Sequence, residues 1–144
     1  MKRFSSHLLT VLLCFLTIRV DAQSNLNIAC SDPELRVMSV FDEEEKTIVK
    51  LTLRTTSKSA VSLYPPSTEG AFFAMDADSG SEFKLIGFDG VEPEPGYKIY
   101  PPHTIIYIKL VFEEIKASKF HLIEGTHFSR EGFWTCMNIK RERY

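Results

Sequence analysis

The segment HLIEGTH contains three side chains with metal-binding chemistry, because His121, Glu124 and His127 stand three residues apart. On a helix this spacing gathers imidazole and carboxylate ligands on one face, as a zinc site requires. On a strand it sends successive side chains to opposite faces, and Gly125 interrupts the element. We therefore expect no metal ligands here and predict that Glu124 accepts backbone N–H groups at a strand end.

The acidic segment DADSGSE also has a pattern that could bind a metal, since Asp76 and Asp78 alternate ahead of Gly80. An EF-hand loop has glycine at its sixth position and a bidentate glutamate at its twelfth, where this chain has Ser81 and Gly87. Between two apolar runs, the segment is typical of a hairpin turn in which glycine adopts a positive φ angle. We predict a turn, with no metal and no other cofactor.

The N-terminus has the pattern of a secretory signal peptide. Lys2 and Arg3 precede the apolar run Leu8 to Ile18, and Val20 and Ala22 provide small residues before a cleavage site. The apolar run is shorter than the roughly 20 residues of a transmembrane helix, and no later run reaches that length without charges. The sequence predicts a signal peptide over 1–22, a single domain over 23–144, no membrane span, and export to the periplasm or the extracellular space.

The predicted export determines which chemistry we expect of the cysteines. Cys14 lies in the signal peptide, so Cys30 and Cys136 alone remain after its removal. Disulfides form and persist in exported proteins, whereas a catalytic cysteine needs a histidine base and a metal site needs more soft ligands. We predict a disulfide between Cys30 and Cys136, which would join the start of the domain to its last strand.

The remaining charged residues give no sign of catalysis. The acidic run Asp42 to Glu45 is typical of a solvated turn, whereas an acid/base pair needs one member that is partly desolvated. No nucleophile elbow, phosphate-binding glycine loop or nucleotide fingerprint is present. The net charge of −2, without a basic cluster, excludes nucleic acid as the expected partner. We predict no catalytic residues and a protein that is not an enzyme.

The elements that must position these residues are strands. In TIVKLTLR, Val49, Leu51 and Leu53 share one face, and similar runs rich in β-branched and aromatic residues follow. The segment TIIYIKLVFEEIKASK also has helical spacing, but its β-branched residues favour a strand. About eight strands and no helix predict an all-β sandwich or barrel. The expected strands are 34–41, 47–54, 60–64, 71–75, 82–88, 104–112, 119–123 and 133–140.

The order of these pieces resembles a group of small exported proteins from Bacteroidota-type bacteria. The resemblance covers Glu34 to Lys140, and its most specific part is FHLIEG followed by a strand with tryptophan. Members of that group are immunoglobulin-like sandwiches of mostly unassigned function. The resemblance therefore implies an immunoglobulin-like antiparallel β-sandwich of about seven to nine strands, and export.

Surface recognition is the function class that remains. The connection Gly87 to Pro102 carries Tyr97 and Tyr100, which either form a recognition loop or cover the open end of the core. Trp134 could stack on a sugar or belong to the core. We predict a non-catalytic binding or accessory module that acts through protein–protein recognition. The alternatives are a carbohydrate-binding module, which needs exposed aromatic residues on one face or loop, and a small hydrolase, which needs a cleft with a base of perturbed pKa.

Overall fold

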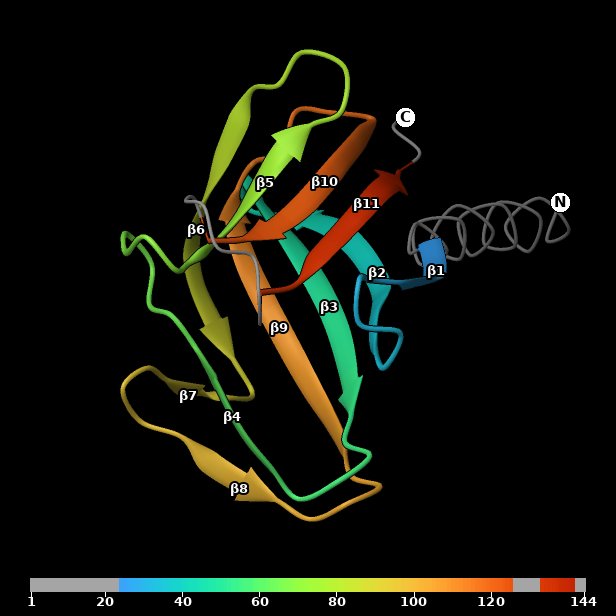
Figure 1. Ribbon diagram of the computed structural model, residues 1–144. Coiled ribbons are helices and arrows are strands. Elements are labelled where there is room, and N and C mark those ends of the chain that lie inside the picture. The colour runs from blue at the N-terminus through green and yellow to red at the C-terminus, as the bar shows by residue number, and fades with distance from the viewer. Residues whose placement is uncertain (1–23, 126–132, 142–144) are drawn as a thin grey trace, which may run out of the picture.

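The computed structural model describes residues 24–125 and 133–141, so the predicted signal peptide and His127 lie outside the described part. Within that part the fold is all-β, with eleven strands and no helix (Figure 1). The strands are β1 (Ser24–Ala29), β2 (Leu35–Glu43), β3 (Lys46–Arg54), β4 (Ser59–Leu63), β5 (Phe72–Asp76), β6 (Glu82–Asp89), β7 (Glu92–Pro93), β8 (Lys98–Tyr100), β9 (Ile105–Glu113), β10 (Lys119–Glu124) and β11 (Thr135–Lys140).

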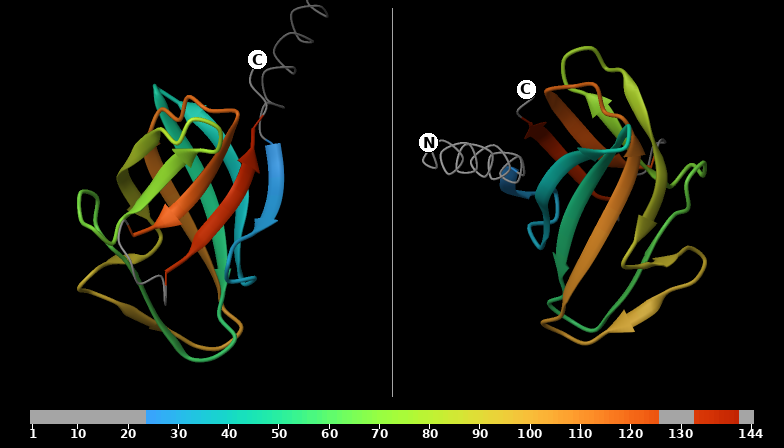
Figure 2. Two further views of the ribbon diagram at one scale, coloured as in Figure 1. Left: turned by 45° about the horizontal axis from the view of Figure 1, so that its top comes forward. Right: turned by 180° about the vertical axis from the view of Figure 1, so that it is seen from behind.

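Eight strands form one curled antiparallel sheet in the order β1-β2-β3-β9-β6-β5-β10-β11. The sheet curls so far that its edge strands β1 and β11 lie side by side (Figure 2). Just after β1, Ser31 N–H donates to the Thr135 carbonyl oxygen over 2.7 Å, and Thr135 N–H donates to Ser31 Oγ over 3.0 Å. The arrangement is thus sandwich- or barrel-like, as alternation along the strands predicted.

A second, three-stranded sheet in the order β7-β4-β8 lies at one end of the curled sheet (Figure 1). Strand β4 pairs in parallel with β7 and antiparallel with β8. Both β7 and β8 come from the connection Gly87 to Pro102, which the sequence predicted to be irregular. These strands are too short to show a hydrophobic period, so only their pairing with β4 defines them.

The eight predicted strands all exist, with ends within two residues of the predicted ones. The total of about seven to nine strands was wrong, because β1, β7 and β8 add to the predicted eight. The immunoglobulin-like arrangement that the resemblance implied is not confirmed by the strand order and stays a prediction.

Alternation builds the core. In β9, Ile106, Ile108, Leu110 and Phe112 are all buried, so the segment with two possible periods is a strand, as predicted. Side chains of β2, β3, β5, β10 and β11 meet them inside the curl. Burial of such side chains supplies most of the driving force for folding, roughly 25 cal/mol per Å² of apolar surface.

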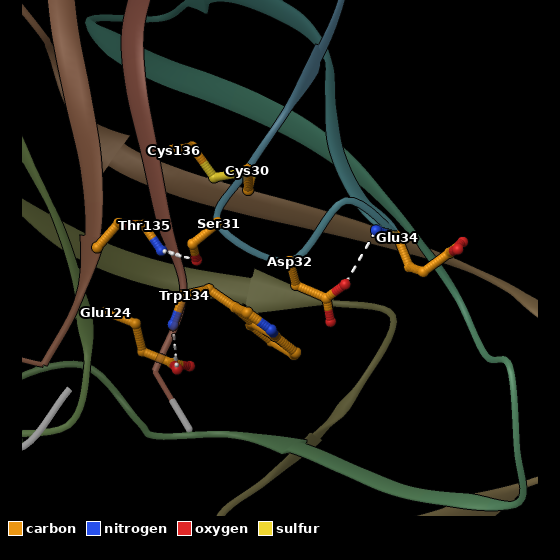
Figure 3. The surroundings of a disulfide bond; sticks show 8 residues. All are labelled: Cys30, Ser31, Asp32, Glu34, Glu124, Trp134, Thr135 and Cys136. Atoms are coloured by element: carbon orange, nitrogen blue, oxygen red, sulfur yellow. Dashed lines mark hydrogen bonds between the residues drawn. A yellow bond between two sulfur atoms is a disulfide. The ribbon is translucent and has the colours of Figure 1, made fainter. Parts of the chain in front are cut away.

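The predicted disulfide is present between Cys30 and Cys136, which are separated by 106 positions in the chain (Figure 3). It joins the residue after β1 to the second residue of β11. The covalent bond therefore lies where the two edges of the curled sheet meet, next to the hydrogen bonds of Ser31.

Candidate functional site

A cavity of about 470 Å³ lies between the disulfide-linked segments and β4. Its volume is within the range of small-ligand sites, roughly 300–1,000 Å³. We call it the Trp134 pocket. Its lining consists of carboxylates, one guanidinium group, aromatic rings, hydroxyl groups and a few aliphatic side chains: Asp32, Glu34, Leu53, Arg54, Thr55, Thr56, Ser59, Ala60, Val61, Ser62, Tyr64, Glu94, Glu124, Phe133 and Trp134.

The disulfide holds two of the segments that line the pocket. Cys30 precedes Asp32 by two residues, and Cys136 follows Trp134 by two residues. Figure 3 shows the indole of Trp134 between the side chains of Glu124 and Asp32, below the disulfide. The cysteine beside the tryptophan therefore serves as a crosslink that fixes one wall of the cavity.

Three aromatic rings line the pocket. Trp134 is half-buried and stacks on core residue Phe72, with ring centroids 6.5 Å apart and an interplanar angle of 20°. Tyr64 and Phe133 form a tilted pair with centroids 6.1 Å apart. Gly70 makes room for the Tyr64 ring, because a Cβ atom at that position would lie 2.4 Å from it. Trp134 thus packs on the core, as one interpretation had it, and also lines the pocket, whereas its stacking on a sugar stays a prediction.

Glu124 is the buried charged group of the pocket, with 5% of its surface exposed. Its backbone N–H donates to the Trp134 carbonyl oxygen over 2.9 Å. Its side-chain Oε1 accepts from the backbone N–H of Trp134 over 3.2 Å (Figure 3). This bond confirms the predicted acceptance of a backbone N–H group at a strand end. Desolvation raises the pKa of Glu124 to about 7, although the hydrogen bond from Trp134 lowers it in part.

The second carboxyl oxygen of Glu124 has no hydrogen-bond partner in the described part of the chain. No fully buried side-chain nitrogen or oxygen atom in that part lacks a partner. Glu124 is itself among the residues that line the pocket. Among the described residues, its second carboxyl oxygen therefore keeps its acceptor capacity for a ligand.

The other carboxylates of the lining are less buried than Glu124. Asp32 Oδ1 accepts from Glu34 N–H over 2.9 Å, and Glu94 Oε2 accepts from Ser62 Oγ over 2.8 Å. With Glu124, the lining holds four carboxyl groups and a single positively charged side chain, that of Arg54. The pocket therefore carries an excess of negative charge.

The structure shows the surroundings of the histidine spacing and of the predicted turn at Gly80. His121 and Glu124 lie on β10, and His121 Nδ1 accepts from Asn138 N–H over 3.0 Å. Gly80 has a φ angle of 76°, as a hairpin turn requires. Asp76 Oδ1 accepts from Asp78 N–H, and this hydrogen bond lowers the pKa of Asp76. In the described part of the chain, no group of three histidine, cysteine, aspartate or glutamate residues is arranged to hold a metal.

The structure separates the two tyrosines of the predicted recognition loop. Tyr97 lies between β7 and β8 and is 62% exposed. Tyr100 is half-buried against the core, with Lys98 Nζ 5.2 Å from its ring centroid. Tyr100 therefore covers the core, whereas a recognition role for the exposed Tyr97 stays a prediction, and neither tyrosine lines the Trp134 pocket.

Sequence reasoning missed the pocket because its residues come from distant segments of the chain. Asp32, Tyr64 and Glu94 give no local pattern that would connect them with Trp134. One signal was available in FHLIEG, where Glu124 follows apolar residues on both faces of a strand. A carboxylate in such a strand lies either at the solvated end of the strand or in a buried site, and a buried carboxylate is uncommon enough to indicate a functional role.

Comparisons with protein-family models, curated proteins and solved structures found no match. Among the described residues, no helix has the length and apolar character needed to cross a membrane. The functional argument therefore depends on the chemistry of the pocket.

Proposed function

We propose that the protein is an exported, non-catalytic binding module that recognises another protein through the Trp134 pocket. The observation that supports this proposal is a cavity with aromatic walls whose lining includes the buried carboxyl group of Glu124, one oxygen of which no described residue engages. Binding sites commonly combine apolar walls with a few polar groups that fix orientation. Location in the periplasm or outside the cell and an immunoglobulin-like fold belong to the same proposal.

A carbohydrate ligand is the second candidate, and the three aromatic rings of the pocket favour it. Sugars stack on such rings, but their hydroxyl groups need donors as well as acceptors. Hydroxyl groups of the pocket are already engaged in part, since Thr55 Oγ1 donates to the Pro101 carbonyl oxygen and Ser62 Oγ donates to Glu94. The lining offers mainly carboxylate acceptors, so it suits a donor-rich ligand better than a neutral sugar.

Glu124 is also the carboxyl group of perturbed pKa that a small hydrolase would need. A hydrolase additionally requires a second group that acts as base or nucleophile on the same substrate. The hydrogen bonds of Asp32 and Glu94 engage main-chain or hydroxyl groups of the protein itself. We therefore assign Glu124 to binding, and hydrolysis of chromogenic esters or glycosides that is lost in Glu124→Gln would contradict this assignment.

Affinity capture from the cell envelope tests the proposal. Ala60→Tyr places a ring at the rim of the pocket on an exposed position of β4, without a change in the core. Ile99→Tyr is the matched control, because Ile99 lies opposite Ala60 on β8, is exposed, and is not part of the pocket lining. We expect Ala60→Tyr to abolish capture and Ile99→Tyr to retain it. Unchanged capture by Ala60→Tyr would refute the pocket as the binding site.

A further inference from the structure

We infer that the Trp134 pocket binds the cationic end of a lysine or arginine side chain presented by the partner protein, with Glu124 as the deepest acceptor. This inference rests on the proposed function and names the ligand chemistry of the same site. The charge of the lining, the Glu124 oxygen that no described residue engages, and the aromatic walls support it independently.

The net negative charge of the pocket lining favours a positively charged ligand. Four carboxyl groups line the cavity against the guanidinium of Arg54, which lies on the exposed end of β3. Inside a partly enclosed cavity such an excess acts through a lower effective dielectric than in water. An anionic ligand would be repelled, whereas a single positive charge would offset part of the excess.

The second carboxyl oxygen of Glu124 favours a ligand that donates hydrogen bonds. An ammonium group has three N–H donors and a guanidinium group has five, and neither has an acceptor that would remain unpaired in this lining. A buried carboxylate that is not fully hydrogen-bonded destabilises the fold, whereas a hydrogen-bonded cation compensates its charge. The ligand would therefore donate to the oxygen of Glu124 that no described residue engages.

The aromatic walls suit the rest of a basic side chain. Trp134, Phe133 and Tyr64 provide ring faces and edges on which the methylene stem of lysine or arginine packs. A cation near such a ring face gains further from the negative charge density of the π-system. A metal ion would not use these rings, and no metal-binding group of three carboxylate, histidine or cysteine residues exists in the described part.

Binding of a cation should depend on pH, because the carboxylate must be ionised to pair with it. The pKa of Glu124 is raised to about 7 by burial. Affinity should therefore increase as pH rises from below to above about 7, and it should be lost on acidification through that value. The other charged or titratable groups that face Glu124 across the cavity are Asp32, Glu34, Arg54, Tyr64 and Glu94.

The fluorescence of Trp134 offers a direct test, because it is the only tryptophan of the chain. The probes are the peptides Ala-Ala-X-Ala-Ala with X as lysine, arginine, norleucine or glutamate, blocked at both ends and titrated into the protein at pH 8 and pH 5.5. Norleucine has the apolar stem of lysine without its charge. Calorimetry confirms each fluorescence titration.

We expect the lysine and arginine peptides to bind and the norleucine and glutamate peptides to bind about tenfold more weakly or not at all. Glu124→Gln should weaken binding of the lysine peptide about tenfold to a hundredfold and remove its pH dependence. Glu82→Gln is the control, because Glu82 is exposed and does not line this pocket, and it should change nothing.

Equal binding of the norleucine peptide, or no binding of either basic peptide at millimolar concentration, would overturn the inference. In both cases capture of the partner that is sensitive to Ala60→Tyr would leave the proposed function intact. Capture that is insensitive to Ala60→Tyr would refute the proposed function itself. The two failures are therefore distinguishable.

Discussion

The two walls of the Trp134 pocket are built in different ways. One wall, here the crosslinked wall, consists of Cys30–Glu34, Glu124 and Phe133–Cys136, and the disulfide closes it. The opposite wall, here the small-sheet wall, is β4 with its neighbours β7 and β8, which pair with it over only two and three residues. A covalent bond and a closed sheet hold the first, whereas a short ladder holds the second.

The walls also hold their carboxyl groups differently. Glu124 in the crosslinked wall is almost fully buried, and no described residue engages its second oxygen, whereas Glu94 in the small-sheet wall is partly exposed and accepts from Ser62. A desolvated charge persists only where the surrounding structure is held firmly, because an easily deformed wall would open to solvate it. The difference indicates that the crosslinked wall holds its carboxyl group in a desolvated site, whereas the small-sheet wall leaves its carboxyl group partly solvated.

Among the variants that test the difference between the two walls, removal of the disulfide should reduce the free energy of unfolding most. Cys30→Ala with Cys136→Ala should destabilise the protein by about 4 kcal/mol, because the crosslink closes a loop of 106 positions in the unfolded chain. Denaturant unfolding followed by Trp134 fluorescence measures the loss. The wild-type protein without residues 1–22, the predicted signal peptide, should show no free thiol when it is unfolded without reductant, and two titratable thiols would contradict the crosslink.

Glu124→Gln should have the second largest effect on the free energy of unfolding, and this effect should depend on pH. Because the pKa of Glu124 is raised to about 7 from its usual 4.5, the unfolded state loses this proton first as pH rises. The wild type therefore loses about 3 kcal/mol of stability between about pH 4 and pH 8 through this group, whereas the variant does not. Unfolding of both proteins at the two pH values measures this, and parallel pH profiles would show that Glu124 is solvated.

Truncation of Tyr97 and Tyr100, which lie near β8 outside the pocket, should reduce stability less, and the loss should differ between the two tyrosines. Tyr100→Ala should cost about 2 kcal/mol, because its ring packs against the core. Tyr97→Ala should change stability by less than about 0.5 kcal/mol, as expected for an exposed position. Melting curves measure both. Partner capture that is lost in Tyr97→Ala at unchanged stability would support the loop, rather than the pocket, as the recognition surface.

Ser62→Ala should have the smallest effect. The variant removes the hydrogen bond from Ser62 Oγ to Glu94, which is partly exposed, and should cost about 0.5–1 kcal/mol. Ser118→Ala, an exposed serine outside the pocket, is the control. A loss as large as that of the disulfide variant would show that the small-sheet wall is as firmly held as the crosslinked wall.

Much of the fold could be predicted from local pattern. Alternation in segments such as Ile105–Glu113 located eight strands, because one face of each strand is buried and the side-chain period of a strand is two. The turn at Gly80 followed from residue types that favour positive φ. The pair Cys30 and Cys136 followed from counting the cysteines that remain after predicted signal removal. These features depend on neighbours in the sequence or on composition alone.

What only the tertiary structure decided is the environment of particular side chains. The difference between Tyr97 and Tyr100, the pairing of β7 and β8 with β4, and the pocket around Trp134 all depend on where distant segments meet. The raised pKa of Glu124 is the clearest case, since desolvation is a sum over every group packed around a carboxyl. The residues that line the pocket with Glu124 are distributed along the chain from Asp32 to Trp134, so no local pattern of the sequence predicts this environment.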